Sequence, residues 1–80
     1  MSMLYCDVWR GLSVELHSSD CKDVDRARSK GFKCGTVEGD GLVRAIDTHI
    51  RISAEAGIAL SSDCYRVMPC VRKSLSRLDK

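Results

Sequence analysis

Five cysteines and two histidines are the residues of this chain whose side chains could bind a metal or act as nucleophiles. They are Cys6, Cys21, Cys34, Cys64 and Cys70, with His17 and His49. A structural zinc site usually contains two close pairs of the C-x2-C kind, because a short turn presents two thiolates to one ion. The closest pair here, Cys64 and Cys70, is separated by five residues. A site made of His17, Cys21 and Cys34 is geometrically conceivable, but the spacing favours free thiols that pack as small apolar side chains. We therefore predict no metal and no cofactor.

The cysteines also bear on the compartment in which we expect the chain to work. Their odd number and irregular spacing differ from a disulfide framework. The first residues, Met1 to Asp7, lack the basic region and the long apolar core of a secretion signal. No run of eighteen apolar residues is present, so no transmembrane helix is predicted. We expect a cytoplasmic protein with reduced thiols and no membrane contact.

Catalysis finds little support in the residue pattern. A nucleophilic serine or cysteine needs a base within hydrogen-bond reach, and the sequence places neither His17 nor His49 beside one. Asp47 and Glu55 would lie two turns apart on one predicted helix, where nothing pairs them for acid–base work. We expect no enzymatic activity and assign no catalytic residue.

The first half of the chain, residues 1–39, predicts a β-β-α-β unit. β-Branched and aromatic residues form two runs on either side of Gly11, which suits a hairpin turn because glycine accepts positive φ. Gly31 is placed to end a short helix that follows a cluster of N-cap residues. We expect a hairpin over residues 3–17, a helix over 22–30 and a third strand over 32–37.

The second half, residues 40–80, is organised by apolar residues at every fourth position. This row, named here the seam, consists of Leu42, Ile46, Ile50, Ala54 and Ile58. Such spacing stacks side chains on one face of an α-helix and predicts a helix over 42–56. Polar residues at 61–63 and a later apolar stripe favour a second helix over 62–78, kinked at Pro69, over the alternative of one longer helix that ends near Met68. The predicted fold is one α+β domain of 80 residues, a three-stranded sheet of antiparallel type followed by two helices.

Residues 53–67 resemble the DNA-binding helix-turn-helix of bacterial repressors. Gly57-Ile58 matches the turn glycine and the aliphatic residue after it, and Ser53 matches the small residue four positions earlier. Asp63 stands where the motif has a buried aliphatic residue, and Arg66-Val67 matches the Arg-Val that ends it, one position late. The resemblance implies a recognition helix over 61–68. It would place Ser61, Ser62 and Arg66 near the bases, and Arg72 and Lys73 on phosphates.

Size and charge favour a protein that works by binding. A domain of 80 residues has a small core, and domains of this size often dimerise. The net charge of +2 is too low to indicate a nucleic-acid binder by itself. The last fifteen residues carry five basic residues against Asp79, which would suit either a solvated helix end or an acidic partner.

We therefore expect a homodimer that binds and inhibits or sequesters another protein. Phage and prophage antirepressors, which remove a repressor from DNA, and inhibitors of host proteins are of this size and style. The alternative is a small helix-turn-helix transcriptional regulator that binds DNA. The predicted dimer interface comprises Leu42, Ile46, Ile50, Leu75 and Leu78. The predicted partner-binding residues are Trp9, Tyr65, Arg66 and Arg72, chosen because Trp, Tyr and Arg dominate binding energy at interfaces.

Overall fold

The centre of the fold is a β-hairpin, seen in a computed structural model that describes residues 2–78, with side chains as far as residue 73. Strand β1 (Met3–Arg10) pairs antiparallel with strand β2 (Ser13–Ser18), and Trp9 lies opposite Val14. The turn between them contains Gly11 at φ 64°, a left-handed conformation that glycine adopts without steric cost. The predicted hairpin is confirmed.

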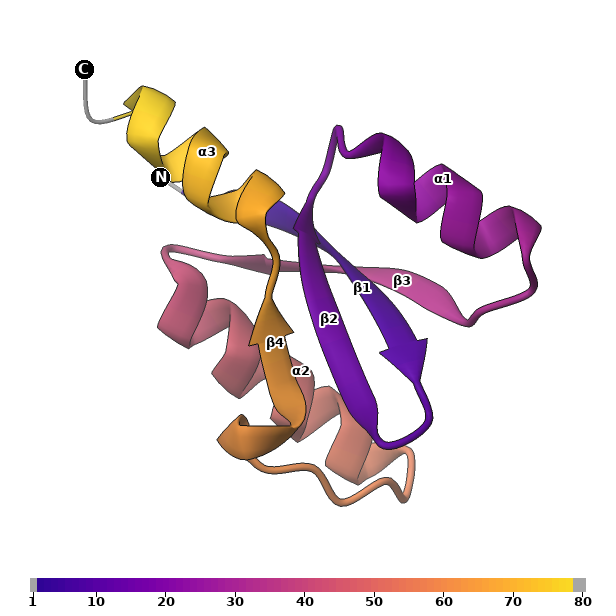
Figure 1. Cartoon of the computed structure of the whole chain (residues 1–80). Helices are drawn as coiled ribbons and strands as arrows, with labels where there is room; N and C mark the ends of the chain where they lie inside the picture. The colour runs from indigo at the N-terminus through magenta and orange to yellow at the C-terminus, as the bar shows by residue number, and fades with distance from the viewer. Residues whose placement is uncertain (1, 79–80) are drawn as a thin grey trace.

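Two further strands complete a mixed sheet in the order β3-β1-β2-β4 (Figure 1). Strand β3 (Cys34–Gly39) pairs antiparallel with β1, as predicted for the third strand. Strand β4 (Tyr65–Val67) pairs parallel with β2, and we did not predict it. The α+β class is thus confirmed, but the sheet has four strands in the described residues and is not wholly antiparallel. Strands β3 and β4 form its two edges.

Helices pack on both faces of this sheet. Helix α1 (Lys22–Ser29) covers one face, while helix α2 (Leu42–Glu55) covers the other and helix α3 (Pro69–Leu78) packs beside β2 (Figure 1). Adjacent residues of a strand point to opposite faces, so Tyr5 and Cys6 enter different cores. The core under α2 and α3 contains Tyr5, Leu16, Val37, Ala45 and Val71. The core under α1 contains Cys6, Val8, Val24 and Ala27. None of the helices in the part of the chain that the structure describes has the length and hydropathy needed to cross a membrane.

Helix α2 confirms the prediction of a long helix but turns a different face to the sheet. Its buried residues are Ala45, His49 and Ser53, whereas Ala54 of the seam is exposed. The cause is close packing, because a Cβ built on Gly39 of β3 would lie 2.5 Å from the backbone nitrogen of Ala45. Only small side chains fit at that contact, so the large aliphatic residues lie beside it.

The predicted second helix over 62–78 is wrong in its first half. Residues Ser62–Cys64 form a 3-10 helix, Tyr65–Val67 form β4, and the helix begins only at Pro69. Proline suits the first turn of a helix, because the amide it lacks has no partner there. The recognition helix expected over 61–68 is therefore not formed, and the helix-turn-helix resemblance does not extend to the structure.

Candidate functional site

A groove lies between the edge strand β3 and helix α2. Its volume is about 200 Å³. It is lined by Asp7, Trp9, Lys33, Gly35, Thr36, His49, Ile52, Ser53, Ala56 and Ile58. Ile52, which is 56% exposed, presents a large apolar side chain to the groove beside Trp9 and Ile58. The groove therefore combines an open strand edge with an apolar lining.

The backbone of β3 presents hydrogen-bonding groups along the groove. Trp9 donates its backbone amide to the carbonyl of Lys33, so this pair of residues is a hydrogen-bonded pair of the ladder. In an antiparallel ladder such pairs recur at every second residue. The amide and carbonyl groups of Cys34, Thr36 and Glu38 therefore point away from β1. No strand among the described residues pairs with this outer edge.

A buried polar network forms the floor of the groove. The carboxylate of Asp7 accepts a hydrogen bond from the indole of Trp9 at 2.9 Å, and lies 3.3 Å from Nε2 of His49. Nδ1 of His49 contacts the hydroxyl of Tyr65 and lies 3.5 Å from Oγ of Ser53. If Nε2 donates to Asp7 and Nδ1 accepts from Tyr65, every polar group in the network is satisfied. The network fixes Trp9 and α2 relative to the sheet.

This network has the order carboxylate–imidazole–hydroxyl and ties β1, α2 and β4 together from the side chains of Asp7, His49 and Tyr65. Ser53 also lines the groove, and its side chain is 5% exposed. Burial, with the negative charge of Asp7 behind it, raises the pKa of Tyr65 to about 12. Tyr65 therefore remains a neutral hydroxyl at physiological pH.

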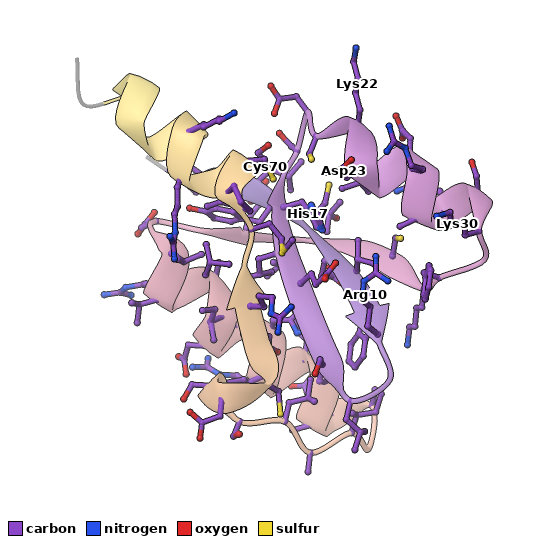
Figure 2. The ribbon with its side chains drawn as sticks, viewed as in Figure 1. Arg10, His17, Lys22, Asp23, Lys30 and Cys70 are labelled. Atoms are coloured by element: carbon purple, nitrogen blue, oxygen red, sulfur yellow. The ribbon has the colours of Figure 1, made fainter. Side chains whose placement is uncertain are left out.

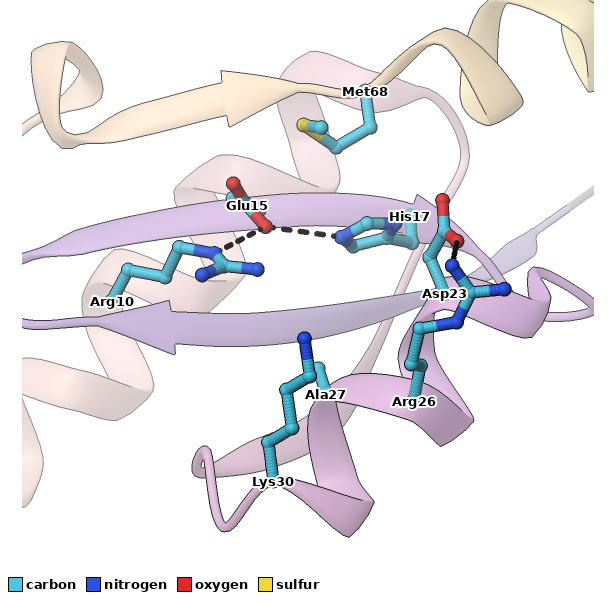
Figure 3. Close-up of a pocket in the computed structure, with 8 residues that line it drawn as sticks. All are labelled: Arg10, Glu15, His17, Asp23, Arg26, Ala27, Lys30 and Met68. Atoms are coloured by element: carbon cyan, nitrogen blue, oxygen red, sulfur yellow. Dashed lines mark hydrogen bonds and ion pairs between the residues drawn. The ribbon is translucent and has the colours of Figure 1, made fainter.

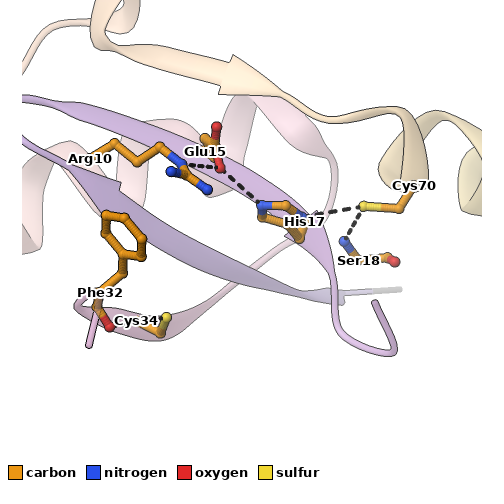
Figure 4. A network of polar contacts seen from close by, with 7 residues as sticks. All are labelled: Arg10, Glu15, His17, Ser18, Phe32, Cys34 and Cys70. Atoms are coloured by element: carbon orange, nitrogen blue, oxygen red, sulfur yellow. Dashed lines mark hydrogen bonds and ion pairs between the residues drawn. The ribbon is translucent and has the colours of Figure 1, made fainter. Parts of the chain in front are cut away.

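A second polar cluster occupies the other side of the sheet, around His17 (Figure 2). Nε2 of His17 lies 3.4 Å from Glu15, which pairs with Arg10 at 2.9 Å (Figure 4). Nδ1 of His17 lies 3.7 Å from the sulfur of Cys70. Potential ligand atoms of His17, Cys21 and Cys70 all lie within 4.8 Å of one another.

Burial and hydrogen bonding have opposite effects on the pKa of Glu15 in this cluster. Burial alone would raise the pKa of Glu15, but hydrogen bonds from Arg10 and His17 outweigh it and hold the pKa below its usual range. Burial raises the pKa of the Cys21 thiol, and the neighbouring Cys70 adds to the rise. A pocket of about 220 Å³ adjoins the cluster, between β2 and α1 (Figure 3). It is lined by Arg10, Glu15, His17, Asp23, Arg26, Ala27, Lys30 and Met68.

The structure separates the residues predicted to bind a partner. Trp9 lines the groove, and Tyr65 lies half-buried next to His49 of its floor. Arg66 pairs in register with Glu15, whose side chain lies on the face of the sheet away from the groove. Arg72 is exposed on α3. Trp9 is thus the one predicted partner residue that lines the groove among the described residues.

The predicted dimer residues have mixed positions. Leu42 and Ile46 pack against the core of their own chain, and Ile50 is half-buried. Leu75 and Leu78 belong to α3, but their side chains lie outside the described part of the structure. The seam is therefore used partly within the monomer, and the dimer remains a prediction.

The position of Cys70 beside His17 was not predicted. The suggested trio contained Cys34, whose sulfur instead contacts the carbonyl of Phe32 at 3.5 Å. Cys70 reaches the cluster because β4 pairs with β2 and brings the start of α3 to His17. That pairing joins residues about fifty positions apart in the sequence, and a pattern of neighbouring residues does not predict it.

Comparisons with protein family models, with curated proteins and with solved structures found no match to this chain.

Proposed function

We propose that this protein is a small non-enzymatic regulator that binds another protein through the groove between β3 and α2. The observation that carries the proposal is the apolar pocket beside an open strand edge. The occupant we infer is an extended segment of the target protein that adds a strand to β3. Holding such a segment would keep the target in a state unable to engage its own ligand or DNA, as an inhibitor or antirepressor does.

The backbone supplies the affinity in this mode. An unpaired strand edge is a template for another strand, and proteins usually shorten or cover it. The outward groups of Cys34, Thr36 and Glu38 offer an added strand a row of donors and acceptors. Main-chain hydrogen bonds of this kind bind a peptide, while pockets for its alternate side chains select the sequence.

The side chains of the groove suggest the chemistry of the bound segment. A cavity of about 150 Å³ accommodates a benzene ring, so the groove of about 200 Å³ suits one large apolar side chain. The ammonium of Lys33, which also lines the groove, lies 4.9 Å from the centre of the Trp9 ring. We expect an aliphatic or aromatic residue next to an acidic residue that pairs with Lys33.

Trp9 makes this proposal directly measurable, because it is the only tryptophan of the chain. Random peptides displayed on phage would be selected on the wild-type protein, and the enriched peptides titrated by Trp9 fluorescence. We expect Thr36→Pro to lower peptide affinity at least tenfold, since proline removes the outward amide without breaking the β1–β3 ladder. The matched control, Thr36→Val, keeps the amide and a β-branched side chain, and should bind like the wild type.

Both variants must retain the far-ultraviolet circular dichroism of the wild type for the comparison to count. Peptides that bind Thr36→Pro and Thr36→Val equally well would show that strand addition is wrong. A selection that enriches no peptide able to change Trp9 fluorescence would contradict the groove as the binding face.

A further inference from the structure

Three potential metal ligands converge from three separate elements of the fold. His17 belongs to β2, Cys21 caps the start of α1, and Cys70 lies in the first turn of α3. Their ligand atoms all lie within 4.8 Å of one another. Figure 4 shows the side chains of His17 and Cys70 directed at each other. We propose that His17, Cys21 and Cys70 bind a zinc ion.

The separations fit a tetrahedral zinc ion after a small adjustment. With zinc–sulfur and zinc–nitrogen bonds of about 2.3 and 2.0 Å, a thiolate and an imidazole bound to one ion lie roughly 3.5 Å apart, and two thiolates roughly 3.8 Å apart. The sulfur of Cys70 lies 3.7 Å from Nδ1 of His17. The widest separation in the trio is no more than 4.8 Å, so a movement of about 1 Å suffices.

The surroundings of His17 provide an independent argument. Histidines that bind a metal through one nitrogen usually donate the other N–H to a carboxylate, which fixes the ring and its tautomer. Here Nε2 of His17 lies 3.4 Å from the Glu15 carboxylate, which leaves Nδ1 facing Cys70. Arg10 holds Glu15 from the other side at 2.9 Å.

The sulfur of Cys70 is also oriented by the backbone. It accepts a hydrogen bond from the amide of Ser18 at 3.4 Å (Figure 4). Such a bond favours the thiolate that a metal requires. Thiolate and imidazole together select zinc over calcium or magnesium, which prefer oxygen ligands. Three protein ligands leave the fourth corner to a water or to an added ligand.

A metal here would join β2 and the start of α1 to the start of α3, which lies about fifty residues later in the chain. Small domains often add a structural metal because their cores supply little stability. A ligand that binds only the folded state stabilises it by mass action.

The test is a titration of metal-free, fully reduced wild-type protein with zinc, followed by native mass spectrometry and thermal unfolding. We expect one zinc ion per chain and an unfolding temperature that rises with zinc concentration. Cobalt in place of zinc should give the absorption bands of tetrahedral thiolate coordination. Failure to bind one zinc ion at micromolar concentration would overturn the proposal without any variant.

Variants assign the ligands. Cys21→Ser and Cys70→Ser should each weaken zinc binding at least 100-fold, and Glu15→Gln should weaken it about 10-fold to 100-fold. Cys34→Ser and Cys64→Ser are the matched controls, because their sulfurs lie outside the trio, and both should bind zinc like the wild type. Loss of binding in Cys34→Ser with retention in Cys70→Ser would overturn the assignment.

Discussion

At the residue scale, α2 contributes to two polar pairs that differ in burial. His49 and Asp7 are buried at 8% and 5% side-chain exposure, whereas Arg51 and Asp47 are 75% and 70% exposed. Replacing His49 by Leu leaves the Asp7 carboxylate buried and removes the imidazole that contacts it at 3.3 Å. We expect His49→Leu to reduce the free energy of unfolding by about 3 kcal/mol, because a buried carboxylate loses a hydrogen-bond donor.

Arg51→Leu is the control for this prediction. It removes a solvent-exposed pair from the same helix, and such pairs contribute about 0–1 kcal/mol. Urea denaturation of both variants measures the difference. Equal losses in the two variants would show that the network under the groove does not hold α2 on the sheet.

Tyr65 gives a second prediction at this scale, the dependence of stability on high pH. The ordinary tyrosine pKa is 10.0, and the folded protein raises that of Tyr65 to about 12. Between these values the unfolded chain releases the proton while the folded protein retains it, so stability falls as pH rises from about 10 to about 12.

The measurement is urea unfolding at several pH values, with Tyr65→Phe as the comparison. The variant should lose less stability over this pH range, because Tyr5, whose pKa burial also raises, is the one tyrosine left to contribute. Parallel losses in the wild type and the variant would contradict the assignment to Tyr65.

At the element scale, the approach of α2 to β3 depends on a single glycine. A Cβ at Gly39 would lie 2.5 Å from the backbone nitrogen of Ala45 and 2.8 Å from its Cα, so a side chain there must displace the helix. We expect Gly39→Ser to reduce the free energy of unfolding by about 1–3 kcal/mol.

Gly41→Ser, the same change two residues later, supplies the control. Nothing lies within 4 Å of a Cβ at Gly41, and this residue caps α2, where serine is favoured. Thermal unfolding should show Gly41→Ser equal to or above the wild type. A Gly39→Ser protein as stable as the wild type would mean that α2 does not pack this closely.

Elements with strong local patterns were predictable, and those that depend on distant pairing were not. The hairpin about Gly11 and the long helix from Leu42 follow from turn chemistry and periodicity over neighbouring residues. Strand β4 is three residues long, and it forms by pairing with β2, where Tyr65 lies opposite Val14. The position of the buried face of α2 depends on the bare backbone at Gly39, so periodicity alone misplaced it.

The same reasoning explains how much of the candidate sites the sequence could predict. Trp9 was identified by residue type and does line the groove. Asp7 and His49 were not paired in advance, because strand and helix positions forty-two residues apart must first be packed together. Two of the three clustered ligands, His17 and Cys21, were considered together, since they are close in sequence. The position of Cys70 could not be predicted, because it depends on the pairing of β4 with β2.

At the scale of the whole molecule, α2 exposes a large apolar side chain on each of two flanks. Ile52 is on the flank that lines the groove with β3, and Val43, which is 81% exposed, lies about half a turn away around the helix. Leu42 and Ile46 of the predicted dimer interface border Val43 and are partly buried in their own chain. A second copy could cover Val43 while leaving the groove open to a target.

The predicted homodimer can therefore be separated from target binding by two matched substitutions. We expect light scattering to show a dimer of the wild-type protein at micromolar concentration. Val43→Asp should produce a monomer, because a two-fold interface would bury the aspartate and bring it close to the same aspartate of the second copy. Ile52→Asp should remain dimeric and lose binding of the peptides selected on the groove.

A wild-type monomer, or a Val43→Asp protein that stays dimeric, would mean that this flank is not the dimer interface. Loss of dimerisation in Ile52→Asp would instead place the second copy in the groove and displace the target from it.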